Sequence, residues 1–159
     1  MHIARDGRFE RTDIWREGKW LDLWSVVHVL SGFSIGLGFY YLGFGAFASV
    51  ALALLSLISY EMWETIVRIE ETHTNRFMDV VVGMVSFIPA FFLVAPLLSE
   101  ASLILVFGLV FTATVAMSVF GWRASQKATV LEERIRRRYV TQRARLLERE
   151  AQLHKRFRR

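Results

Sequence analysis

Three long stretches without a charged residue constrain this chain more than any other feature of its sequence. No Asp, Glu, Lys or Arg occurs in residues 23–60, in residues 80–99 or in residues 101–122. A helix of about 20 apolar residues crosses the hydrocarbon core of a bilayer. A soluble protein of 18.4 kDa has too small an interior to bury three such stretches. The sequence therefore predicts an integral membrane protein.

The first stretch is too long for one membrane crossing. Its 38 residues would form a helix of about 57 Å, whereas the hydrocarbon core is about 30 Å thick. Gly43 and Gly45 supply a place for a tight turn. We therefore expect an all-α bundle of four transmembrane helices, arranged as two antiparallel hairpins. The expected spans are residues 24–42, 46–63, 78–97 and 101–122.

The Lys and Arg residues predict the orientation of these spans. Five precede residue 23, two lie in the loop between the second and third spans, and thirteen follow residue 122, whereas the two short links carry none. Basic residues flanking membrane spans stay in the cytoplasm. We therefore expect a bacterial inner-membrane protein with both termini cytoplasmic. The charged, Trp-containing residues 1–22 predict an uncleaved interfacial segment.

Charge also divides the chain into two parts. Residues 1–122 carry seven basic and eleven acidic residues, net −4, and residues 123–159 carry thirteen and four, net +9. The prediction is a transmembrane domain over residues 1–122, followed by a basic cytoplasmic helix over residues 123–159. Apolar positions recur on one face of that helix. They are Leu131, Ile135, Tyr139, Leu146, Leu153 and Phe157, with Gln142 on the same face.

Three uses of the basic helix stay open. Contact with anionic lipid headgroups is favoured, because each basic residue near such a surface contributes about 1 kcal/mol. Docking of a protein partner or self-association is the next use, and a homo-oligomer stays open with it. Nucleic acid is the least favoured, because no folded reading element accompanies the basic patch. That patch consists of Arg134, Arg136, Arg137 and Arg138.

Polar residues converge at the cytoplasmic ends of the first three spans. His28 lies about one turn inside the first span, Glu61 and Glu64 end the second, and Asn75 and Asp79 open the third. Spacings of three and four residues place each pair on one helix face. Ionisable groups at membrane depth face the bundle interior. These five side chains are therefore predicted to share one region.

Two interpretations of this polar region stay open. In the structural one, which we favour, the side chains pair with one another and with Arg68 or Arg76, and so fasten the helices together. In the other, imidazole and carboxylates hold a divalent metal ion, and Arg68 or Arg76 binds an anionic headgroup. The chain has no Cys, so thiolate ligands are excluded. His73 is expected to be a solvated loop residue.

Small residues and prolines indicate how the spans pack. Gly32 and Gly36 on the first span and Gly83 on the third have the four-residue spacing that lets helix backbones approach closely in lipid. Packing within one bundle is favoured over a homodimer interface. Pro89 is expected to bend the third span, and Pro96 to help end it.

The polar layout of residues 22–90 resembles small bacterial inner-membrane proteins of the VanZ-like type. The residues that carry the resemblance are His28 with Gly32 and Gly36, Tyr60-Glu61-x-Trp63-Glu64, and Asn75-x-x-x-Asp79-x-x-x-Gly83. Those families commonly have Asp-Lys before the His and Asp-Glu-x-x-Gln in the second helix, patterns that this chain lacks. The resemblance implies a compact helical membrane fold with a role at the cell envelope.

The sequence predicts two functions and does not settle whether the chain is an enzyme. The favoured one is a non-enzymatic accessory or scaffold component of the membrane, whose basic helix contacts lipid or a partner. The alternative is a membrane-embedded, metal-dependent enzyme that acts on a lipid or lipid-linked substrate at the cytoplasmic face.

Overall fold

The computed structural model describes residues 2–3, 9–10, 15, 20–66 and 73–157. Two units are compact by themselves, Ile14–Trp122 and, together, Met1–Asp13 and Arg123–Arg159. The elements in chain order are β1 (His2–Ile3), β2 (Phe9–Glu10), α1 (Leu23–Tyr41), α2 (Ala46–Ile66), α3 (His73–Pro89), the π-helical turn η1 (Ala90–Val94), the 3₁₀ turn η2 (Ala95–Leu97) and α4 (Glu100–Phe157). The strands pair antiparallel, with His2 opposite Glu10.

Four helical segments among the described residues are long and apolar enough to cross a membrane. They are Leu23–Tyr41, Ala46–Trp63, His73–Leu97 and Glu100–Arg149. The prediction of a helical protein with four candidate spans is therefore confirmed, and the two strands add only four residues near the N-terminus. The third helix begins at His73, five residues before the predicted start of that span, so the placement of His73 in a loop was wrong. The predicted start at residue 78 was chosen from the apolar residues that suit lipid. The helix itself begins earlier, with a more polar turn that precedes those residues.

Helix α1 is fixed at its start by a capping box. The Asp22 carboxylate accepts hydrogen bonds from the backbone N–H groups of Trp24 and Ser25, at 2.7 and 3.2 Å. The Ser25 hydroxyl in turn accepts from the backbone N–H of Asp22 at 3.2 Å. These bonds satisfy amide groups that have no partner inside the helix. At its other end, Gly43 adopts a φ of 72° in the turn toward α2, a conformation that favours glycine.

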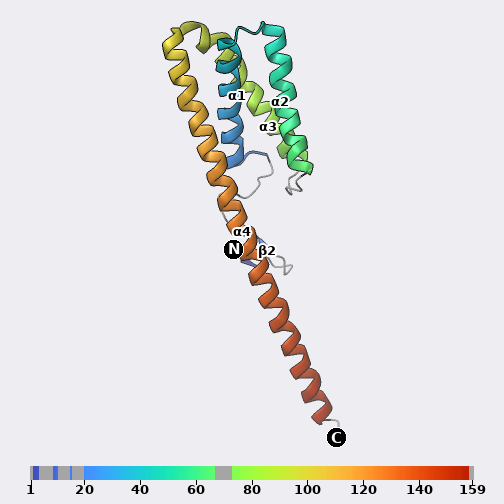
Figure 1. The fold of residues 1–159 in the computed structure, drawn as a ribbon. Helices are drawn as coiled ribbons and strands as arrows, with labels where there is room; N and C mark the ends of the chain where they lie inside the picture. Colours follow the sequence, from blue (N-terminus) through green and yellow to red (C-terminus); the bar gives the residue numbers. More distant parts are fainter. Residues whose placement is uncertain (1, 4–8, 11–14, 16–19, 67–72, 158–159) are drawn as a thin grey trace. The chain divides into compact units, whose positions relative to one another are not determined.

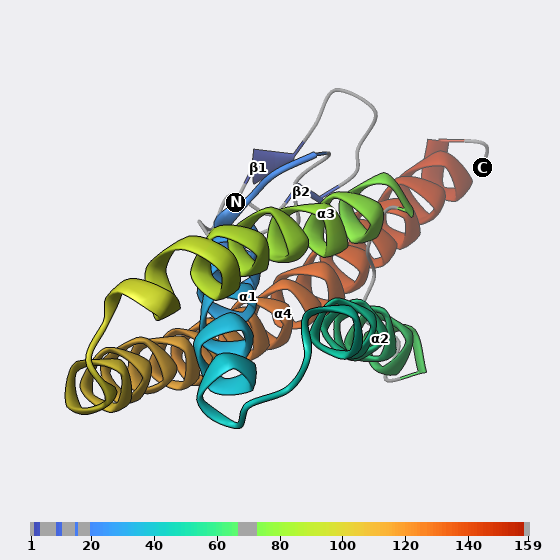
Figure 2. The same cartoon turned by 90° about the horizontal axis from the view of Figure 1, so that it is seen from above.

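Helices α1 and α3 cross at van der Waals contact of their backbones. A Cβ atom added at Gly32 would clash with the Gly83 carbonyl oxygen and lie 2.8 Å from its carbon. One added at Gly36 would lie 2.9 Å from the Phe87 carbonyl oxygen. The Ser86 hydroxyl donates across the same interface to the Val29 carbonyl at 2.6 Å. This crossing fixes which faces of α1 and α3 meet (Figures 1 and 2).

Two apolar clusters continue the packing toward the turn between α1 and α2. One has Leu37, Ala95 and Leu103 at its centre. The other has Ala53, Phe87 and Phe91, with the two phenyl rings stacked at 5.7 Å between centroids. Regular α-helix ends at Pro89, after which the chain continues through η1 and η2 to Leu98. Pro89 has no N–H to donate to the carbonyl of Val85, four residues earlier, and the change from α-helical to π-helical geometry follows directly after it.

Trp15 is buried in the same unit as the helices. Its ring lies 5.1 Å from that of Trp24 and 6.0 Å from that of Phe120, edge to face in both cases. Its carbonyl oxygen accepts from the Trp24 indole N–H at 3.3 Å. A Cβ added at Gly121 would clash with the six-membered ring of the Trp15 indole. Gly121 therefore leaves room on α4 for the indole of Trp15.

Candidate functional site

Three buried side chains from three helices converge at one point. His28 of α1, Glu61 of α2 and Asp79 of α3 are 4%, 6% and 1% exposed. The His28 Nε2 atom lies 3.5 Å from Glu61 Oε1 and 3.8 Å from Asp79 Oδ2. One nitrogen or oxygen of each side chain lies within 4.8 Å of the others. We call these three residues the HED cluster, from their one-letter codes.

Asp79 is held in place by side chains of two helices. Its Oδ1 atom accepts a hydrogen bond of 2.7 Å from the Ser25 hydroxyl of α1. Its Oδ2 atom accepts one of 3.2 Å from the Asn75 amide, one turn earlier on α3. The same Asn75 nitrogen donates to Asp22 Oδ2 at 3.2 Å, so the network reaches the N-cap of α1. Buried hydrogen bonds to a carboxylate are strong, and they fix the orientation of Asp79.

The other predicted site residues fall in different places. Asn75 is fully buried in the network just described. Arg76 is partly buried in the first turn of α3, and His73 beside it is exposed. Glu64 belongs to α2 by its backbone, and its side chain is outside the described part of the structure. Arg68 lies outside the described residues altogether.

Two residues that support the HED cluster were not predicted as site residues, although their spacing in the sequence is recognisable. Asp22 and Ser25 have the spacing of a capping box, an acceptor followed three residues later by a polar side chain. That pattern marks the start of α1 and places the Ser25 hydroxyl on the same helix face as His28. Tyr60, which entered only as part of the motif that carries the family resemblance, has its ring edge to face against the His28 imidazole at 5.6 Å. No spacing in the sequence predicts that contact.

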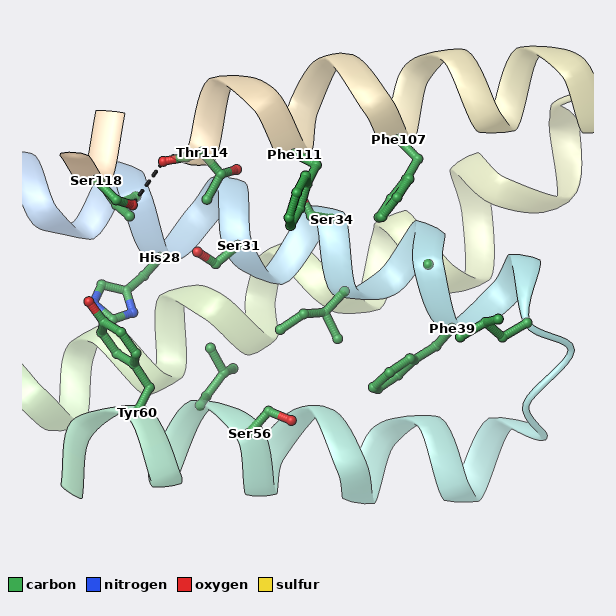
Figure 3. A pocket seen from close by; sticks show the side chains of 15 residues that line it. His28, Ser31, Ser34, Phe39, Ser56, Tyr60, Phe107, Phe111, Thr114 and Ser118 are labelled. Carbon is green, nitrogen blue, oxygen red and sulfur yellow. Dashed lines mark hydrogen bonds between the residues drawn. The ribbon is translucent and has the colours of Figure 1, made fainter. Parts of the chain in front are cut away.

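An apolar groove with a volume of about 470 Å³ leads to the HED cluster. Figure 3 shows His28 of α1 and Tyr60 of α2 close together at one end and Phe39 toward the other, with Phe107 and Phe111 of α4 along one side. From His28 to Phe39 the helix rises about 16 Å, which is about half of a 30 Å hydrocarbon core. The groove is therefore about as long as one leaflet is thick.

Hydroxyl groups are the main polar atoms along this groove. Those of Thr114 and Ser118 donate to carbonyl oxygens four residues earlier on α4, each at 2.8 Å. The Ser34 hydroxyl is buried and makes no hydrogen bond to the described residues. Mostly apolar walls with a small number of polar groups are typical of ligand-binding sites.

The predicted basic patch lies on the second unit, in the part of α4 that follows Trp122. Arg134, Arg136, Arg137 and Arg138 are all exposed. Arg137 is paired with Glu133 one turn earlier, at 3.6 Å between Nη2 and Oε2. Such exposed pairs contribute little to stability.

Comparisons with known proteins found no matching family model, no matching curated protein and no matching solved structure. The resemblance to VanZ-like proteins therefore stays a prediction.

Proposed function

We propose that this chain is a non-enzymatic scaffold or accessory component of a bacterial inner membrane. The observation that carries the proposal is the hydrogen-bond network from Asp22 through Asn75 and Asp79 to Ser25. It joins α1 to α3, so these polar side chains have a structural use at the ends of the helices. Polar residues at such positions commonly hold a bundle together.

The proposal includes an orientation with both termini, the link between α2 and α3, and the basic helix in the cytoplasm. The distribution of Lys and Arg supports it, because these residues occur only in segments that four crossings place on one side. In this orientation α1 and α2 cross the membrane in opposite directions, and so do α3 and α4. The HED cluster then lies in the cytoplasmic leaflet, and the basic helix faces a surface rich in anionic lipid.

Contact between the basic helix and anionic lipid tests this function. The chain has no cysteine, so Val140→Cys, next to the basic patch and exposed, provides a single labelling position. With an environment-sensitive fluorophore there, the full-length protein should show blue-shifted emission in nanodiscs containing phosphatidylglycerol. Replacing the four arginines of the patch with Gln should weaken the contact about a thousandfold, since each contributes about 1 kcal/mol. High salt should reverse the shift by screening.

The control is the same labelled protein in nanodiscs of phosphatidylcholine alone, where no shift is expected. Identical emission in the two lipids would contradict lipid contact and favour a protein partner. The same Val140→Cys variant reports orientation, because a membrane-impermeant maleimide should label it only after the cells are broken.

A second candidate function is action on a lipid or lipid-linked substrate at the cytoplasmic face. The observation that favours it is the apolar groove, which is long enough for an acyl chain and ends at His28. A lipid in this groove would place its polar head beside the HED cluster. The cluster's imidazole and carboxylates are groups that serve in general acid–base chemistry.

Lipid retained during purification tests this second function. Mass spectrometry of the protein in mild detergent should detect a bound lipid, and Ser56→Trp should displace it, because that side chain lines the groove from α2. The matched control is Leu55→Trp, which introduces the same ring at an exposed neighbouring position that does not line the groove. Equal lipid retention in both variants would argue against a lipid in the groove.

A further inference from the structure

The HED cluster has a spacing that hydrogen bonding does not explain. Hydrogen bonds between nitrogen and oxygen are about 2.7–3.2 Å long. The His28 Nε2 atom is 3.5 Å from Glu61 and 3.8 Å from Asp79, so it makes a close bond to neither carboxylate. An imidazole nitrogen carries either one proton or one lone pair, and it serves one partner at a time. Yet both carboxylates approach this nitrogen from different helices.

The spacing matches that of ligands around one metal ion. Zinc binds nitrogen and carboxylate oxygen at about 2.0–2.2 Å, so two ligands in tetrahedral geometry lie about 3.4 Å apart. The two separations from His28 are 3.5 and 3.8 Å, close to that value, and all three atoms lie within 4.8 Å of one another, so the two carboxylates need to move together only slightly to share one ion. We propose that His28, Glu61 and Asp79 together bind one divalent first-row metal ion. This goes beyond the proposed function, because a scaffold needs no metal.

The surroundings of Asp79 are those of a metal ligand. Carboxylates and imidazoles that bind metals are held by hydrogen bonds from a second set of residues, which fix their direction. Ser25 and Asn75 hold the two oxygens of Asp79 at 2.7 and 3.2 Å. The Tyr60 ring packs edge to face on the imidazole of His28. Asp79 and His28 are therefore held in place by neighbouring residues before an ion arrives.

Charge and burial favour a divalent cation at this point. Two carboxylates and a neutral imidazole carry −2, so a divalent ion makes a complex of zero net charge. A neutral complex suits the buried position of all three side chains, since isolated charges are costly in a medium of low polarity. One nitrogen and two oxygens, with no thiolate in the chain, select Zn²⁺, Mn²⁺ or Fe²⁺ rather than a soft ion.

The groove leaves room for a further ligand. Three protein ligands with one open position is the arrangement of many reactive metal sites, whereas structural zinc sites are closed by four. His28 lines the groove as well as the cluster. A water molecule or the polar head of an amphiphile that entered through the groove would therefore approach the ion from the side of His28.

Zinc titration of the full-length, tag-free protein in detergent tests this site. Calorimetry should find one Zn²⁺ per chain in the wild type. His28→Gln and Glu61→Gln should each weaken binding by about 100-fold or more, and Ser25→Ala, which keeps all three ligands, should weaken it about tenfold. The matched controls are His73→Gln and Glu133→Gln. They make the same substitutions at exposed positions away from the cluster, and they should bind zinc as the wild type does.

Circular dichroism separates lost binding from lost folding, because each variant is compared at equal helical content. Zinc should also raise the melting temperature of the wild type but not of His28→Gln, since a ligand that binds only the folded state stabilises it. A folded wild type that takes up no zinc would overturn the proposal. So would uptake that is the same in the wild type, His28→Gln and Glu61→Gln.

Discussion

Gly32→Ala should destabilise the bundle by about 3 kcal/mol, although alanine is the better helix former. The new methyl group would meet the carbonyl group of Gly83 on α3, at a position where backbone faces backbone. No side chain there can rotate away, so α1 and α3 must separate. Overpacking costs about 1–3 kcal/mol even where side chains can adjust, and it outweighs the gain of about 1 kcal/mol in helix propensity. Unfolding by denaturing detergent, followed by circular dichroism, measures the change.

Gly108→Ala is the matched control for this prediction. Gly108 also lies inside a helix, and an added Cβ there would meet no atom within 4 Å. The same substitution should therefore leave stability unchanged or raise it slightly. Equal stabilities of the two variants would mean that α1 and α3 do not touch at Gly32.

Asp79→Ala should also cost about 3 kcal/mol or more. The carboxylate is almost fully buried and accepts hydrogen bonds from Ser25 and Asn75. Its removal leaves both donors buried without this acceptor, and hydrogen bonds to a charged group contribute about 1.5–3 kcal/mol each. Asp79→Asn keeps an acceptor oxygen and should lose less. Thermal unfolding of the two variants in the same detergent gives the comparison.

Glu133→Ala serves as the control for the loss of a carboxylate. Its partner is Arg137, and both side chains are well exposed on α4. Exposed pairs of this kind contribute little, so the melting temperature should stay close to that of the wild type. If Asp79→Ala were equally mild, the network between α1 and α3 would not stabilise the bundle.

The four helices were predictable from the sequence because length and the absence of charged residues are enough to identify a helix that can cross a bilayer. A charge-free run of sufficient length specifies a membrane-crossing helix, and Gly43 and Gly45 divide the longest run. The helix ends were less predictable, since a helix continues past the part that lipid contacts. α3, for example, begins at His73, before its apolar residues.

The candidate site was predictable only as a list of residues. Spacing placed His28, Glu61 and Asp79 at corresponding depths, but it contains no information on how each helix is rotated about its axis. That rotation depends on the close contact of Gly32 with Gly83 and on the hydrogen bond from Ser25 to Asp79. The groove was not predictable, because its walls belong to α1, α2 and α4 and exist only once these helices have packed.

X-ray absorption at the zinc edge of the loaded full-length protein tests most directly whether three helices bring their ligands to one ion. We expect a first shell of nitrogen and oxygen atoms at about 2.0–2.2 Å, with the outer-shell signature of one imidazole. That signature should disappear in His28→Gln and persist in His73→Gln. A first shell without imidazole, or a spectrum that His28→Gln leaves unchanged, would contradict the account.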